Sequence, residues 1–251
     1  MHFSDFIIIG GARCGSSWLR WSLGQNPGVL MLRGEPRFLS AYFDAPVLPN
    51  LEKYLPIRFN FSHPERFSQV FYKYCTIGEK NPDYHTMSYA RMVLLDHLFP
   101  QAKFVLLTRD PVERMWSHLK HQFREDAGLE GFLRGDEGRA PDAGGEKWRW
   151  IVRSLGEGLF TQSIRRWVTA FGASRILVIR HEDLSADAAA VLSRVCGHIG
   201  VSFPPDWSVA RNAGVRRNTS EEIAMPEFLR EYLEEMYHEE RLALKALPGT
   251  L

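Results

Sequence analysis

The sequence has few of the features that mark secreted, metal-binding or membrane-spanning proteins. Its 251 residues include only three cysteines, at the widely separated positions 14, 75 and 196. An odd number without a Cys-x-x-Cys pair excludes a full disulfide framework and a zinc pattern, and it favours reduced thiols. No apolar run approaches the length of a membrane span, and the first residues form no basic leader. These absences predict a cytoplasmic protein without a bound metal.

The chain also lacks an excess of either charge. It has 31 Lys and Arg against 30 Asp and Glu, so bulk charge does not suggest nucleic acid as a partner. With 45% hydrophobic and 24% charged residues, the composition is that of a globular protein. The length suits one substantial domain or two small ones, and without repeats or a strong linker we expect one domain over 1–251. Any anion site must be built locally.

Short apolar runs alternate with segments of helical periodicity. We expect buried strands at 6–9, 103–108 and 175–180. Helices are expected at 16–25, 87–99, 111–124, 160–171, 187–199 and 226–246. This alternation predicts a P-loop-like α/β fold with a central parallel sheet flanked by helices. Two segments lack a clear period: 127–145 is expected to be a mobile loop, and 210–225 a basic closing loop.

The segment from Gly10 to Trp18, called the anion loop below, joins the first strand to the first helix. Its glycines allow a tight turn that presents N–H groups to an anion, and the helix N-terminus adds partial positive charge. Ser16 and Ser17 add hydroxyl donors, and Arg13 adds a full charge. A tight connection without a ligand is the alternative. Ser16 stands where an ATP-binding P-loop has lysine, which disfavours a kinase or NTPase.

A resemblance to a known family enters with the second half of this loop. Ala12–Trp18 (ARCGSSW) resembles the 5'-phosphosulfate loop of sulfotransferases that use 3'-phosphoadenosine 5'-phosphosulfate (PAPS). The departures are Ala12 in place of proline and Cys14 in place of a hydroxyl residue. The resemblance implies PAPS as donor and adenosine 3',5'-bisphosphate (PAP) as product. It implies that the donor is held by Arg13, Cys14, Gly15, Ser16, Ser17 and Trp18.

A second motif follows the strand at 103–108. Arg109 lies at the carboxyl end of that strand, where open α/β sheets bind ligands, and Ser117 lies two turns into the next helix. Taken alone, a surface arginine paired with Asp110 or Glu113 is the simpler interpretation. The string LLTRDPVERMWSH nevertheless resembles the 3'-phosphate motif of the same family, in which the arginine and serine hold the 3'-phosphate. In this family a basic loop late in the sequence closes over the nucleotide. The resemblance therefore makes Arg216 and Arg217 candidates for binding the nucleotide.

Two further stretches suggest catalytic groups, because sulfuryl transfer needs a general base and cations. Residues 78–84 (GEKNPDY) resemble a stretch of the glycosaminoglycan-type sulfotransferases, in which the lysine contacts the transferring group, so Lys80 takes that role with Arg13. Residues 33–39 (RGEPRFL) resemble the segment that carries the catalytic glutamate, which implies Glu35 as base. A lysine exposed and paired with Glu79 is the alternative for Lys80, and His85 is a rival base.

The sequence thus predicts an O-sulfotransferase acting on a hydroxyl of a small molecule or a saccharide. A P-loop-type kinase or NTPase is one alternative, and a non-catalytic module that binds adenosine bisphosphate is another. Neither the acceptor nor the oligomeric state follows from the residues.

Overall fold

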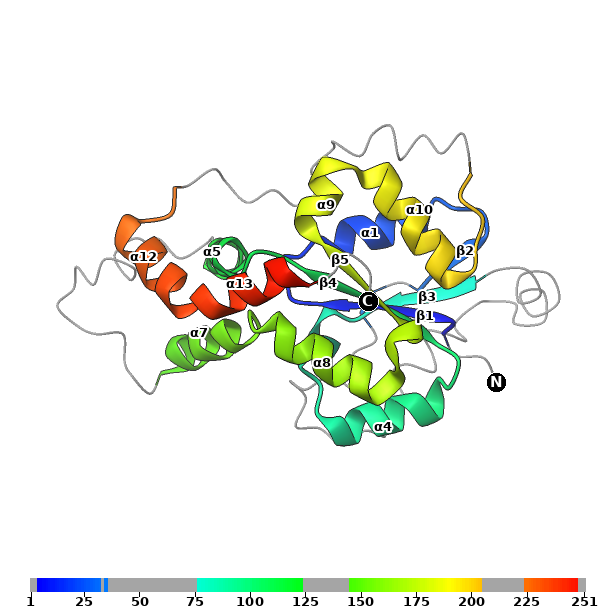
Figure 1. Cartoon of the computed structure of the whole chain (residues 1–251), viewed down its shortest axis with the longest axis horizontal. Helices are drawn as coiled ribbons and strands as arrows, with labels where there is room; N and C mark the ends of the chain where they lie inside the picture. The colour runs from blue at the N-terminus through cyan, green and yellow to red at the C-terminus, as the bar shows by residue number, and fades with distance from the viewer. Residues whose placement is uncertain (1–3, 33, 36–75, 124–144, 205–223, 248–251) are drawn as a thin grey trace.

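The computed structural model describes residues 4–32, 34–35, 76–123, 145–204 and 224–247. Five strands within these ranges form one sheet in the order β2-β3-β1-β4-β5, and all neighbouring strands are parallel (Figure 1). The strands are β1 (Phe6–Gly10), β2 (Val29–Met31), β3 (Thr76–Lys80), β4 (Lys103–Thr108) and β5 (Ile176–Arg180). The predicted central parallel sheet flanked by helices is confirmed.

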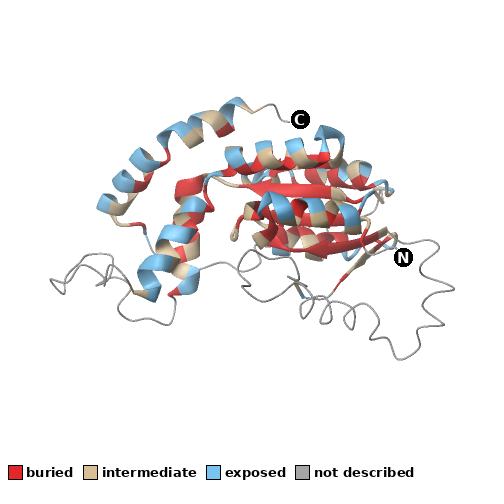
Figure 2. Ribbon diagram, turned by 90° about the horizontal axis from the view of Figure 1, so that it is seen from below, coloured by how far each residue is buried: buried red, intermediate tan, exposed pale blue. Residues whose placement is uncertain are grey.

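The centre of the sheet forms the main hydrophobic core. All of β1 and nearly all of β4 are buried, as expected for parallel strands covered on both faces. Figure 1 shows α1 (Ser16–Leu23), α9 (His181–Ala186) and α10 (Ala188–Ile199) over one face. The other face carries α4 (Tyr89–Leu98) and α8 (Phe160–Phe171). Figure 2 shows these helices buried toward the sheet and exposed on their outer sides.

A second, smaller core lies beside the sheet. It is formed by α5 (Pro111–Gln122), α7 (Glu146–Gly156) and α12 (Glu227–Met236), with α13 (His238–Ala246) following. Its buried side chains are Val112, Met115, Trp116, Leu119, Phe123, Met225, Leu233 and Tyr237. Because α5 begins directly after β4, this second core sits next to the end of a central strand.

Several expected elements differ from those observed. The strands β2 and β3 were not expected, because β2 has only three residues and β3 (TIGEK) is mostly polar or glycine. The helix α7 and the short α9 were missed. The single helix expected at 226–246 is wrong: the helix breaks at Tyr237, whose buried ring anchors there and whose hydroxyl donates to Leu155 O at 2.6 Å. No helix of the described ranges is long and apolar enough to cross a bilayer.

Candidate functional site

The candidate site lies at the carboxyl edge of the sheet. The strand register pairs Ile8 of β1 with Lys80 of β3, and Gly10 with Leu107 of β4. The anion loop, the end of β3 and the residues after β4 therefore share one edge, which is where open parallel sheets bind ligands. Three segments far apart in the sequence meet there.

The backbone of the anion loop has the conformation that its glycines predict. Gly10 has φ 135°, and a Cβ there would lie 2.4 Å from Leu107 O, so the close approach to β4 requires glycine. Gly15 has φ 93° and forms the N-cap of α1, which no side chain caps and which has no acid in its first turn. Arg13 is also left-handed, at φ 72°, a strained conformation for a residue with a side chain. The free N–H groups and partial positive charge at the uncapped start of α1 can therefore bind an anion.

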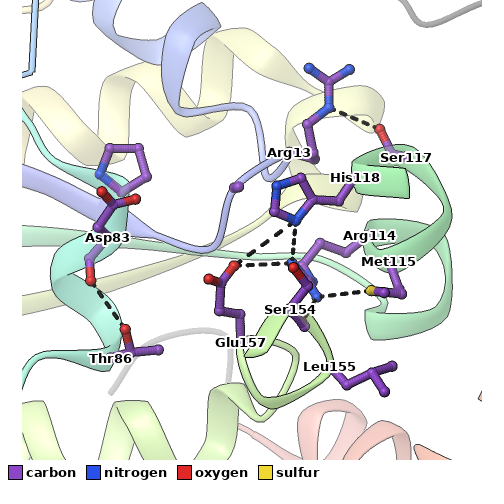
Figure 3. Close-up of polar contacts among 12 residues, drawn as sticks. Arg13, Asp83, Thr86, Arg114, Met115, Ser117, His118, Ser154, Leu155 and Glu157 are labelled. Atoms are coloured by element: carbon purple, nitrogen blue, oxygen red, sulfur yellow. Dashed lines mark hydrogen bonds and ion pairs between the residues drawn. The ribbon is translucent and has the colours of Figure 1, made fainter. Parts of the chain in front are cut away.

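Arg13 links the two expected phosphate-binding motifs. Its Nε donates to Ser117 Oγ at 3.1 Å, and Arg109 Nη1 donates to the carbonyl oxygen of Arg13 at 3.0 Å (Figure 3 shows the first contact). Burial lowers the pKa of Arg13, and the nearby charge of Arg109 lowers it further. Two guanidinium groups this close repel each other, and an anion between or beside them relieves that repulsion.

The simpler interpretation of Arg109, a surface pair with Asp110 or Glu113, is wrong. Asp110 caps α5 by accepting from Val112 N and Glu113 N, and it pairs with Arg241 at 2.8 Å. Glu113 pairs with Arg230 at 3.4 Å. Both acids are therefore engaged elsewhere.

Lys80 and Glu35 form a close ion pair at the same edge. Lys80 Nζ lies 2.6 Å from Glu35 Oε1 and donates to Ser17 Oγ of α1 at 3.1 Å. The expected alternative, an exposed lysine paired with Glu79, is wrong because Lys80 is buried and successive side chains of a strand face opposite ways. Glu79 instead accepts from Ser4 Oγ and Asn81 Nδ2. The ion pair thus stands beside the first turn of α1.

Some of the residues expected to bind the donor have side chains that are buried or packed against the main core instead of lying free at the carboxyl edge of the sheet. The Cys14 thiol lies in the main core, and burial raises its pKa to about 12, so Cys14 can contribute only its backbone N–H. Ser16 is buried, while Trp18 is partly buried and packs against the main core. Arg216 and Arg217 lie outside the described residues, as do 127–144 and 210–223 of the two expected loops.

The rival base His85 is buried below the sheet edge. Its Nδ1 lies 3.0 Å from Pro82 O, and its Nε2 lies 3.1 Å from Glu157 O. The two carbonyls favour the charged ring, but burial outweighs them and lowers the pKa of His85 to about 4. Both ring nitrogens are occupied, so His85 has no position from which to take a proton from a substrate.

Sequence reasoning missed a group of polar side chains next to Ser117, called the Arg114 cluster here: Arg114, His118 and Glu157. The Arg114 guanidinium is fully buried, 3.5 Å from Glu157 Oε2 and 3.3 Å from His118 Nδ1, and it donates to Ser154 O (Figure 3). Burial raises the pKa of Glu157 to about 7. Arg114 and His118 are four residues apart on α5, a spacing that puts them on one helix face and could have signalled the pair. Glu157 follows α7, a helix that the sequence did not predict, so no pattern in the sequence pointed to its contact with Arg114.

Comparisons with known proteins relate the chain to one family. The model of the sulfotransferase family matches residues 5–205. The bifunctional heparan sulfate N-deacetylase/N-sulfotransferase 1 of Mus musculus is 30% identical over 112 residues, 44% of this chain and 13% of its own length. Its counterpart 4 from Mus musculus is 24% identical over 218 residues, 83% of this chain and 24% of its own length. The chain thus spans less than a quarter of the length of these relatives.

A solved structure supports the fold. The crystal structure of a sulfotransferase from Alicyclobacillus acidocaldarius superposes with a TM-score of 0.66 at 23% identity, covering 98% of this chain and 96% of that chain.

Proposed function

Because the chain belongs to the sulfotransferase family, we propose that it transfers a sulfuryl group from PAPS to an acceptor hydroxyl. The observation that carries this proposal is the Lys80–Glu35 pair, 2.6 Å apart and bonded to Ser17 at the start of α1. It places a carboxylate and an ammonium beside the loop that would hold the phosphosulfate. Transfer reactions of this kind depend mainly on positioning and charge stabilisation.

The proposed roles follow from the charges. The Glu35 carboxylate takes the proton of the acceptor hydroxyl as its oxygen bonds to sulfur. The bond between sulfur and the bridging oxygen breaks, and PAP leaves with the electron pair on its 5'-phosphate. Lys80 is proposed to balance the charge that develops on the bridging oxygen and the sulfuryl oxygens. Lys80 also holds Glu35, so the acceptor must displace part of this contact to reach the carboxylate.

The contacts of Arg13 support binding of both phosphates. Arg13 and the first turn of α1 are proposed to hold the 5'-phosphosulfate, and Arg109 and Ser117 the 3'-phosphate. The chain of contacts from Arg109 to Arg13 and on to Ser117 joins the two sites into one polar strip. Such a strip fits a nucleotide that carries anionic groups at two positions.

Calorimetry with PAP and AMP tests the donor assignment. A charged, hydrogen-bonded phosphate contact contributes about 1.5–3 kcal/mol, so PAP is expected to bind at least about tenfold more tightly than AMP. Equal affinity would remove the 3'-phosphate site. Mg²⁺-dependent turnover of ATP would instead favour a kinase or NTPase, and PAP binding without any transfer would favour a non-catalytic module.

Transfer from labelled PAPS to a panel of saccharides, phenols, lipids and peptides tests the reaction itself. We propose a small molecule or a saccharide as acceptor. The names of the two mouse relatives include N-sulfotransferase, so the panel should pair glucosamine with N-acetylglucosamine. Label on the hydroxyl of both sugars supports O-transfer, whereas label on glucosamine nitrogen alone would replace the hydroxyl by an amine.

A further inference from the structure

The Arg114 cluster fixes the hydrogen-bonding state of His118. The guanidinium of Arg114 is a donor at every accessible pH, and its Nη1 lies 3.3 Å from His118 Nδ1. Nδ1 must therefore accept, and the proton of a neutral imidazole must sit on Nε2. Glu157 Oε2 lies 3.5 Å from Arg114 Nη1 and 4.0 Å from His118 Nδ1, too far from the ring nitrogen to accept a proton from it in a hydrogen bond.

The His118 ring is also held mechanically. The Trp150 ring of α7 packs edge-on against it, with ring centroids 4.6 Å apart. Because a second contact at Nδ1 fixes the ring rotation, Nε2 has a defined direction. Figure 3 shows this other ring nitrogen on the side of the ring away from Arg114 and Glu157.

Nε2 of His118 is a donor still available to a ligand. Among the described residues no hydrogen-bond partner of Nε2 is found, and the side chain keeps 13% of its surface exposed. His118 directly follows Ser117, which accepts from Arg13, so the ring stands next to the anion loop. A fixed N–H group beside the guanidinium groups of Arg114 and Arg13 can donate a hydrogen bond to an electron-rich oxygen.

We propose that His118 contacts the substrate as an uncharged hydrogen-bond donor, its Nε2–H binding an oxygen of the sulfuryl donor or of the acceptor. Arg114 and Glu157 are then positioning residues, because they act through His118. This assignment rests on the proposed sulfotransferase activity and adds a contact to the same site. It gives the enzyme a donor that adds no charge near Glu35 and Lys80.

The electrostatic surroundings keep this donor neutral. Burial is the main cause that lowers the pKa of His118, to about 3, and the positive charges of Arg114 and Arg13 and the neighbouring His121 lower it further. Glu157 is the carboxyl that faces the ring, with its Oε2 4.0 Å from Nδ1. His118 therefore binds as Nε2–H across the neutral pH range rather than as an acid.

Two substitutions of similar size separate the two ring nitrogens. His118→Gln can place an amide N–H near the position of Nε2, whereas His118→Asn reaches only the position of Nδ1. We expect His118→Asn to lower kcat/KM about 10–100-fold, the range of one lost hydrogen bond to a charged group, and His118→Gln to recover most of it. His97→Asn, on the exposed side of α4, is the matched control and should behave as wild type.

Nitrogen-15 spectra of the histidine rings test the tautomer and the contact directly. We expect the Nε2–H tautomer of His118 from pH 5 to 8 and a shift of its Nε2 on adding ligand. A shift with PAPS but not PAP assigns the contact to the sulfuryl group. A shift that appears only when glucosamine or p-nitrophenol joins PAP assigns it to the acceptor.

The outcomes distinguish this inference from the proposed function. An Nδ1–H tautomer, or equal kcat/KM for wild type, His118→Asn and His118→Gln, overturns the role of His118 while leaving the transfer reaction standing. A wild-type chain that binds neither PAP nor PAPS overturns both. An Arg114→Lys variant that keeps the fold but shifts the ring toward Nδ1–H, with a lower kcat and an unchanged affinity for PAP, supports the positioning role.

Discussion

Two carboxylate–cation pairs lie close to the anion loop, and they differ in almost every physical respect. Lys80 and Glu35 are 2.6 Å apart and keep 9% and 21% of their side chains exposed. Arg114 and Glu157 are 3.5 Å apart, with 0% and 7% exposed. The first pair joins a strand end to the segment after β2, and the second joins α5 to the end of α7.

The difference suggests separate tasks for the two pairs. A partly hydrated pair can exchange its contacts for those of a substrate at modest cost, because water screens the separated charges. A buried pair cannot, because removing one partner leaves the other charge without solvent. Contact with the substrate is therefore expected of Glu35, whereas Arg114 is expected to support the fold and, through it, the position of His118.

Glu35→Gln should have the largest effect on turnover. Glutamine keeps the shape of glutamate but cannot accept a proton, so we expect kcat to fall by about 10²–10⁴-fold while PAP affinity stays near wild type. Steady-state kinetics with labelled PAPS and calorimetry with PAP measure both quantities. Glu239→Gln, on the exposed side of α13, is the control. Full turnover by Glu35→Gln would give the role of base to another residue.

Arg114→Met should have the largest effect on stability. At pH 8, above the pKa of about 7 to which burial raises Glu157, it leaves a buried carboxylate without its partner, and such changes lower the free energy of unfolding by about 3–5 kcal/mol. The double variant Arg114→Met/Glu157→Gln removes the stranded charge and should regain a large part of the loss. Urea unfolding measures both.

Lys80→Met sharpens the contrast between the two pairs. Glu35 remains partly hydrated after this change, so the loss of unfolding free energy should be clearly smaller than for Arg114→Met, while turnover falls. Equal destabilisation by the two single variants would remove the proposed division between a functional and a structural pair.

Arg109→Ala tests a cation that belongs to neither pair. Arg109 would contact a phosphate remote from sulfur, so its loss should raise the KM for PAPS about 10–100-fold with a small change in kcat. Binding of AMP should change much less than binding of PAP. An unchanged KM for PAPS would end the assignment of Arg109 to the 3'-phosphate.

The parts of the molecule that follow local rules could be predicted from the sequence. The buried run 103–108 and the helix 160–171 match the observed β4 and α8, because continuous apolar strands and amphipathic helices carry their own periodicity. Gly10 and Gly15 also marked the turn correctly. Contacts between residues far apart in the sequence were harder to predict. The family resemblance named both Glu35 and Lys80 as catalytic groups, but no spacing in the sequence predicts their ion pair.

The Arg114 cluster shows why the remainder could not be predicted. Arg114 looks like an ordinary charged residue of an amphipathic helix until α7 brings Glu157 and the Ser154 carbonyl against it. Its burial is a tertiary effect that no local pattern records. The mostly polar strand β3 was not predicted for a similar reason. Its buried Glu79 accepts a hydrogen bond from Ser4, which lies 75 residues earlier in the sequence.

The pH dependence of stability should show the smallest effect, and it tests the Arg114 cluster. The pKa of His118 is lowered to about 3 and that of His85 to about 4, so the unfolded chain binds more protons than the folded one below pH 6.5. Their contribution to stability is complete above pH 6.5 and is lost as pH falls toward 4. Glu157 acts oppositely: its pKa is raised to about 7, so its contribution is complete below pH 4.5 and is lost as pH rises through 7.

The lowered pKa values of these two histidines, and of His198, which burial also lowers, outweigh the one raised carboxyl and give a net loss of stability on acidification from pH 6.5 to 4. One titrating proton accounts for at most about 1.4 kcal/mol per pH unit, so His118→Asn should flatten the pH dependence of the unfolding free energy by up to that slope. Glu157→Gln should steepen it between pH 4.5 and 6.5, because the opposing contribution is gone. Urea unfolding at half-unit pH steps measures both slopes. Identical slopes for wild type and His118→Asn would mean that His118 is not held neutral by the Arg114 cluster, and the tautomer argument would fail with it.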